Sequence, residues 1–194
     1  FLIVGIGGSA LGPQFLKGAL ETKGLQVSFL DNTDPDGMDR VLEGLDLGAT
    51  LVGVLSKSGG TKETRNAMLE TKKAFEEDGL SFAENAIAIT GKDSALHQQA
   101  LQEGWFGILP LWDWVGGRTS ITGMVGLLPL VLMGRDWKRF LAGAAEMDAW
   151  TRTFSVENPA LQMAHAWFEL GQGIGNKAMV VLPYKDSLLL LGRY

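Results

Sequence analysis

Residues 50–64, Thr-Leu-Val-Gly-Val-Leu-Ser-Lys-Ser-Gly-Gly-Thr-Lys-Glu-Thr, decide the fold because they join an apolar strand to the start of a helix. The run Thr50 to Leu55 is short and rich in valine and leucine, which is typical of a strand buried on both faces. An amphipathic pattern follows it and predicts a helix over Thr61 to Asp78. A buried strand that leads into a helix predicts a βαβ unit and therefore a parallel sheet.

The loop from Ser56 to Thr64 predicts a phosphate site at the start of this helix. The first four amides of a helix lack intrahelical acceptors, and the helix dipole places roughly +0.5 of a charge there. Ser56, Ser58 and Thr61 add three hydroxyls at the same point. A helix cap needs a single hydroxyl, so three hydroxyls and two glycines exceed what capping requires.

Two charged residues of this loop can each be assigned more than one role. Glu63 falls in the first helical turn, where an acid is favourable against the dipole whether or not it has a functional role. Lys57 can give its charge to a phosphate, or its side chain can lie in solvent while its amide alone is used. The spacing of a P-loop is absent from this stretch.

Apolar runs alternate with helical patterns on both sides of this stretch. Further strands are expected at Phe1 to Gly5, Leu25 to Leu30, Ala86 to Thr90, Trp105 to Leu109 and Lys177 to Leu182. Further helices are expected at Leu11 to Glu21, Gly37 to Leu45 and Ser94 to Gln102. The alternation predicts an α/β fold, a three-layer doubly wound parallel sheet with helices on both faces.

The pattern changes after Ser120, where helices are expected at Ile121 to Met133, Asp136 to Thr151 and Pro159 to Leu170 with no strand between them. We therefore expect a first domain over 1–135, connecting helices over 136–175, and the start of a second α/β domain over 176–194. The chain opens on a strand sequence without a methionine and stops within a helical run that begins at Ser187. We expect it to be a fragment of a larger protein.

Composition excludes several kinds of site. The net charge is −5 with scattered basic residues, which argues against nucleic-acid binding. There are no cysteines, and two histidines are too few for a zinc site. His165, on an apolar helical run, is expected to be a packing residue. No apolar run reaches about 18 residues, so we expect no membrane partner and a cytoplasmic location.

The loop Gly5 to Pro13 after the first strand is rich in glycine, which allows left-handed backbone angles and close approach of a ligand. Its Gly5-x-Gly7-x-x-Ala10 spacing also fits a dinucleotide fingerprint, and Asp31 supplies an acid about 20 residues on. A nicotinamide or flavin site, and a tight turn without a ligand, both remain open for this loop alone.

A third loop, Trp112 to Ser120, follows the strand that ends at Leu109. Gly116 and Gly117 bring the backbone close to a neighbour, and Arg118 follows at once. A guanidinium stays protonated and offers five planar donors, which suits an oxyanion that develops during a reaction. An arginine that ties loops together through carbonyls or an acid is the alternative.

Together the loops resemble the glucose-6-phosphate isomerase family, in the same order along the chain. The resemblance includes Gly5 to Pro13, Ser56 to Thr64, Val115 to Ser120, Gly123 to Pro129 and Val181 to Asp186. It implies two flavodoxin-like sugar isomerase domains, a site between them completed across a homodimer, and a role in glycolysis and gluconeogenesis. Thr119 departs from the family, where an aromatic residue is common.

The resemblance also implies roles for individual residues. The substrate-binding set is Gly8, Ser9, Ser56, the amide of Lys57, Ser58, Thr61, Gly117 and Arg118. Arg118 is the implied catalytic residue, stabilising an enediolate, and Glu63 is implied to position a lysine elsewhere in the protein. No cofactor or metal is implied for the conversion of glucose 6-phosphate to fructose 6-phosphate.

The catalytic glutamate, histidine and lysine of the family are not assigned within Phe1 to Tyr194. We therefore expect this chain to supply the phosphate-binding half of the enzyme and to be inactive alone. Three alternatives stay open: a non-catalytic phosphosugar sensor, an isomerase fused to a transaldolase, and the dinucleotide oxidoreductase.

Overall fold

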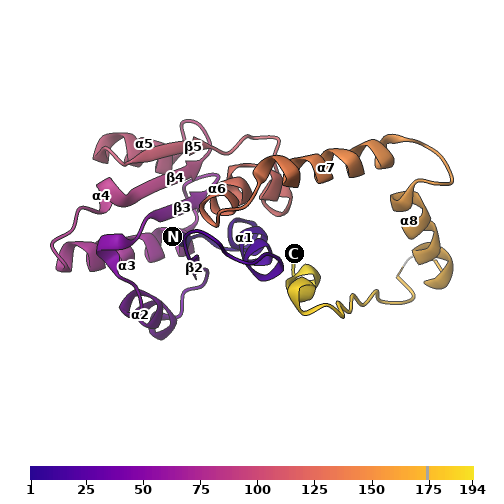
Figure 1. Cartoon of the computed structure of the whole chain (residues 1–194), viewed down its shortest axis with the longest axis horizontal. Helices are drawn as coiled ribbons and strands as arrows, with labels where there is room; N and C mark the ends of the chain where they lie inside the picture. The colour runs from indigo at the N-terminus through magenta and orange to yellow at the C-terminus, as the bar shows by residue number, and fades with distance from the viewer. Residues whose placement is uncertain (174) are drawn as a thin grey trace.

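A computed structural model describes residues 1–173 and 175–194, and its centre is a parallel sheet of five strands (Figure 1). The strands are β1 (Leu2–Val4), β2 (Ser28–Leu30), β3 (Val52–Ser56), β4 (Ala86–Thr90) and β5 (Gly107–Pro110). Their order is β2-β1-β3-β4-β5, and every neighbouring pair is parallel. This is the flavodoxin-like order, whose topological switch point lies between β1 and β3. The predicted α/β fold is confirmed.

Helices follow the strands along the chain. They are α1 (Gly8–Ala19), α2 (Pro35–Glu43), α3 (Lys62–Glu77), α4 (Phe82–Asn85), α5 (Ala95–Glu103), α6 (Met124–Leu132), α7 (Trp137–Arg152) and α8 (Pro159–Leu170). The described residues also form the short 3₁₀ helices η1 (Leu47–Ala49), η2 (Gly117–Thr122) and η3 (Asp186–Gly192). The connection after β3 is the predicted strand-to-helix turn, and α3 begins one residue after the expected start.

The central strands β1, β3 and β4 are buried on both faces, which explains their continuous apolar character. Successive side chains point to opposite faces. Val52 and Val54 join an apolar cluster that includes residues of α2, α3 and α5, whereas Leu55 joins a second cluster that includes residues of α6. Gly53 also faces the second cluster, where a Cβ would lie 2.6 Å from the Phe1 ring, so the missing side chain makes room for that ring.

The last part of the chain leaves the sandwich and returns to it (Figure 1). Helices α7 and α8 extend outward and carry no buried residue along their lengths. The segment after α8 then leads back to α1, where the Tyr194 ring stacks on Phe15 at 5.9 Å between centroids. None of the described helices is both long and apolar enough to cross a bilayer.

Two expectations in this region are wrong. Residues 177–182 form no strand, and Val180 and Leu182 are 72% and 70% exposed. A strand needs a neighbour for its backbone amides and carbonyls, and the described chain places none beside this segment. His165 is exposed rather than packed, because the helix that carries it has no core around it. The helix expected from Ser187 is the 3₁₀ helix η3.

Candidate active site

Loops at the carboxyl ends of β1, β3 and β5 line one cavity of about 450 Å³. This edge, at the β1/β3 switch point, is where open α/β sheets bind ligands. The lining residues are Ile6, Gly8, Ser9, Leu55, Ser56, Lys57, Ser58, Thr61, Thr64, Asp113 and Gly117. The structure therefore brings together all of the predicted substrate-binding residues except Arg118.

The loop after β3 is held in shape by its own hydroxyls. Ser56 is 5% exposed, and its Oγ accepts a hydrogen bond from the Gly59 amide at 3.1 Å and donates to Thr61 Oγ1 at 3.3 Å. Gly59 has a φ of +70°, and a Cβ there would lie 2.3 Å from the Leu96 amide nitrogen. The loop thus requires glycine at this point, and Ser58, exposed at its outer side, accepts from the Gly60 amide at 3.2 Å.

The start of α3 is open toward the cavity. Thr61 occupies the N-cap position with φ −67° and ψ 115°, yet its side chain makes no capping hydrogen bond. Capping therefore does not explain this hydroxyl, and the first-turn amides remain suited to an anion.

Thr64 is a site residue that the sequence analysis did not single out. It is 4% exposed and lines the cavity, and its Oγ1 has no hydrogen-bond partner in the part of the chain that the structure describes. An unpartnered buried hydroxyl costs about 1 to 3 kcal/mol, so such a group points to a missing acceptor. The sequence offered one signal for it, since Thr64 lies one helical turn after Thr61 on the same face.

Lys57 directs its side chain to the third loop. Its Nζ donates to the Asp113 carbonyl at 2.6 Å and to the Val115 carbonyl at 3.1 Å. The side chain is therefore not free in solvent, which was one of the two readings of the sequence. Lys57 is nevertheless one of the residues that line the cavity.

The first and third loops touch backbone to backbone. A Cβ on Gly8 would lie 2.3 Å from the Gly117 carbonyl carbon. Gly7, which precedes α1, has φ 60° and ψ −124°, a conformation that an L side chain does not readily adopt. The glycines of the loop Gly5 to Pro13 thus serve a close approach between two loops as well as a turn.

Arg118 and Glu63 are exposed, and neither lines the cavity. Arg118 follows Gly117 in η2, so it lies one residue from the cavity lining. Ser120 stabilises this 3₁₀ turn, because it is 2% exposed and its Oγ donates a hydrogen bond to the Gly117 carbonyl at 2.6 Å. Asp31, the acid of the dinucleotide reading, accepts a hydrogen bond from Gln14 Nε2 at 2.7 Å.

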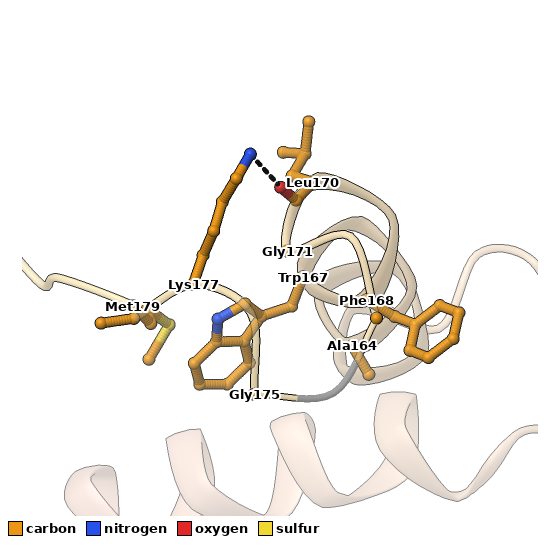
Figure 2. A pocket seen from close by; sticks show the side chains of 10 residues that line it. Ala164, Trp167, Phe168, Leu170, Gly171, Gly175, Lys177 and Met179 are labelled. Carbon is orange, nitrogen blue, oxygen red and sulfur yellow. Dashed lines mark hydrogen bonds between the residues drawn. The ribbon is translucent and has the colours of Figure 1, made fainter.

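A second cavity of about 520 Å³ lies between α8 and the segment that follows it (Figure 2). Trp167 and Met179 point toward this space, and Lys177 Nζ donates to the Leu170 carbonyl at 3.1 Å (Figure 2). The described part of its lining is mainly apolar, with Lys177 as its titratable residue. Among the described residues, no group of three or more His, Cys, Asp or Glu side chains is placed to hold a metal ion.

Comparison with known proteins identifies relatives over the whole chain. The family model for phosphoglucose isomerase matches residues 1–194. A glucose-6-phosphate isomerase from Citrifermentans bemidjiense is 58% identical over 100% of this chain and 37% of its own length. The chloroplastic glucose-6-phosphate isomerase 1 of Arabidopsis thaliana is 54% identical, over 100% of this chain and 32% of its own length.

Solved structures agree with this comparison. The crystal structure of a glucose-6-phosphate isomerase from Chlamydia trachomatis has a TM-score of 0.75 and 35% sequence identity, covering 86% of this chain and 33% of that one. The chain therefore spans about a third of the length of the relatives that it matches.

Proposed function

The chain belongs to the phosphoglucose isomerase family, and on that basis we propose that it is the phosphate-binding part of a glucose-6-phosphate isomerase. The substrates are glucose 6-phosphate and fructose 6-phosphate, which the enzyme interconverts. The cavity at the carboxyl edge of β1, β3 and β5 takes the phosphate group and the adjoining carbons.

One observation carries this proposal: beside the open start of α3 lies the buried hydroxyl of Thr64, which has no hydrogen-bond partner among the described residues. A phosphate oxygen at that point would accept from Thr64 and from the first-turn amides, and it would lie within the field of the helix dipole. The hydroxyls of Ser58 and Thr61 and the Lys57 amide complete the cradle on the same loop. Ser56 shapes the loop through the Gly59 amide.

The reaction we propose is a proton transfer between C1 and C2 through a cis-enediol(ate). A glutamate outside this chain moves the proton, acting as a general base and then as a general acid. Arg118 stabilises the negative charge that develops on the enediolate oxygen. Gly8, Ser9 and Gly117 line the sugar site, and Glu63 positions a lysine outside this chain. The step balances without an electron acceptor, so we propose no cofactor.

We propose that 1–135 is one sugar isomerase domain, 136–175 a set of connecting helices, and 176–194 the start of a second sugar isomerase domain. Exposed apolar side chains on α8 and on residues 178–182 support this division, because a second sheet and its helices would cover them. In a protein of the relatives' full length, the backbone amides of residues 178–182 should resist hydrogen exchange. Exchange there at the rate of an unfolded peptide would contradict the division.

We also propose that the full-length protein is a cytoplasmic homodimer whose active site takes residues from both subunits. Sedimentation equilibrium would measure the oligomeric state. Activity that stays proportional to the monomer fraction on dilution would contradict a shared site.

A coupled dehydrogenase assay tests whether this chain binds the phosphate but lacks the proton-transfer residue. The 194-residue chain should show no isomerisation of fructose 6-phosphate, and the full-length protein should show turnover. Turnover of the short chain near that of the full-length protein would contradict the proposal, because the proton-transfer residue would then lie within this chain.

A further inference from the structure

We propose that Lys57 is a positioning residue, whose ammonium group sets the loop carrying Gly117 and Arg118 relative to the phosphate cradle. This inference rests on the proposed function. It gives the Lys57 side chain a task separate from that of its amide, which belongs to the cradle.

The contacts of Lys57 bridge two loops that are far apart in the sequence. The two acceptors, Asp113 O at 2.6 Å and Val115 O at 3.1 Å, lie 56 and 58 residues further along the chain. Val115 directly precedes Gly116 and Gly117, and Asp113 lies two residues before Val115. Glycines have no side chain to anchor them and lose much conformational freedom on folding, so their neighbours must restrain this loop.

The lysine is itself fixed at its backbone. The Lys57 carbonyl accepts a hydrogen bond from the Gly91 amide at 3.0 Å, at the end of β4. A Cβ on Gly91 would lie 2.8 Å from that carbonyl oxygen, so this contact requires glycine. Lys57 is therefore fixed to the edge of the sheet by its carbonyl and to the third loop by its ammonium group, so it sets the position of that loop relative to the sheet.

A direct role as a phosphate counter-charge is the competing assignment, and the two roles predict different kinetics. A counter-charge interacts with substrate in both the ground state and the transition state, so its loss weakens binding. A positioning residue acts through Arg118, which is needed where charge develops, so its loss lowers kcat. The two carbonyl acceptors favour positioning, since they orient the ammonium toward the third loop.

The third loop carries its own spectroscopic reporter. Trp112 and Trp114 stack at 5.2 Å between ring centroids with 9° between their planes, on either side of Asp113. The Val115 amide closes the same turn by donating to the Trp112 carbonyl at 3.0 Å. Two indoles stacked in this way couple their transitions, and the resulting circular-dichroism couplet depends on the turn that Lys57 holds.

The test uses the full-length protein and Lys57→Met, which keeps the stem and removes the charge. We expect kcat to fall by about tenfold or more. The dissociation constant for sorbitol 6-phosphate, a polyol phosphate that has no carbonyl to isomerise, should change by less than about threefold. The indole couplet, assigned with Trp114→Phe, should weaken. Lys57→Arg, which can also donate to two carbonyls, should recover much of kcat and of the couplet.

Two results would overturn the inference. A large rise in the dissociation constant for sorbitol 6-phosphate with kcat unchanged would make Lys57 a phosphate ligand. An unchanged kcat together with an unchanged couplet would remove any positioning role. Ser58→Ala separates this question from the proposed function: if it leaves sorbitol 6-phosphate binding unchanged while Lys57→Met lowers kcat, the phosphate cradle is wrong and the bridge stands.

Discussion

Gly8 and Gly117 meet with so little space that a Cβ on Gly8 would lie 2.3 Å from the Gly117 carbonyl carbon and 2.4 Å from its oxygen. The contact joins the loop after β1 to the loop that carries Arg118. Both partners are backbone, so neither can move aside as a flexible side chain would. The spacing between two of the three site loops is therefore set at this point.

Gly8→Ala should separate these loops and lower kcat/KM by about tenfold or more, because an added methyl costs roughly 1 to 3 kcal/mol where it meets fixed atoms. Steady-state kinetics of the full-length protein would measure the loss. Gly143→Ala in α7 is the matched control, since a Cβ there meets nothing within 4 Å. Equal activity of the two variants would contradict the role given to the contact.

Thr64→Val should raise the stability of the ligand-free protein slightly and weaken sugar-phosphate binding by about tenfold. The valine removes a buried hydroxyl that has no partner in the described part of the chain, and with it a charge-assisted hydrogen bond of about 1.5 to 3 kcal/mol in the complex. Urea unfolding and calorimetric titration with sorbitol 6-phosphate would measure the two effects.

Thr71→Val in the same helix is the control for this change. Thr71 is 0% exposed, and its Oγ1 donates to the Ala67 carbonyl at 2.7 Å, so the hydroxyl already has a partner and lies away from the cavity. This variant should leave binding unchanged and should not gain stability. Unchanged binding in Thr64→Val together with weakened binding in Thr71→Val would show that Thr64 does not contact the phosphate.

Arg118→Ala should lower kcat by about a hundredfold and change KM much less, because in the proposed reaction the guanidinium stabilises charge that exists only as the reaction proceeds. Steady-state kinetics in both directions would give the two parameters. A rise in KM with an unchanged kcat would show that Arg118 binds substrate without stabilising the enediolate.

Acid should weaken the hydrogen bonds that the Glu103 carboxylate accepts, away from the active site, and so lower the stability of the fold. Burial raises the pKa of Glu103, but hydrogen bonds from Trp105, Gln99 and Lys72, together with the Lys72 charge, outweigh it and lower the pKa below its ordinary value. A carboxyl with a lowered folded-state pKa stabilises the fold above its unfolded-state pKa, and the contribution disappears as the pH falls through the folded value.

Glu103→Gln should therefore reduce the free energy of unfolding at neutral pH, and the difference from the unmodified protein should shrink in acid below the lowered pKa. Urea unfolding across this pH range would measure it. Glu77→Gln is the control, because the Glu77 side chain is 67% exposed and lies 3.8 Å from Lys73 in a surface pair. A constant difference for Glu103→Gln at every pH would contradict the linkage.

The sequence predicted the sheet and the three loops because both depend on local patterns. Buried parallel strands read as apolar runs, and loops at their carboxyl ends meet at one edge whatever the rest of the chain does. The segment 177–182 has the same apolar character and still forms no strand here, since pairing depends on a neighbour that no local pattern supplies.

The finer parts of the site depend on contacts between distant residues. The bridge from Lys57 to Asp113 and Val115 joins residues 56 and 58 positions apart, and no spacing in the sequence predicts it. Thr64 was missed for a similar reason, because a threonine in a first helical turn is ordinary until its burial and its lack of a partner are known.

A crystal structure of the full-length protein with sorbitol 6-phosphate tests the central claim most directly. We predict the phosphate at the start of α3, with its oxygens about 2.5 to 3.2 Å from hydroxyls and amides of the loop Ser56 to Thr64, Thr64 Oγ1 among them. A phosphate bound away from this loop, with the Thr64 hydroxyl still unpartnered, would contradict the account.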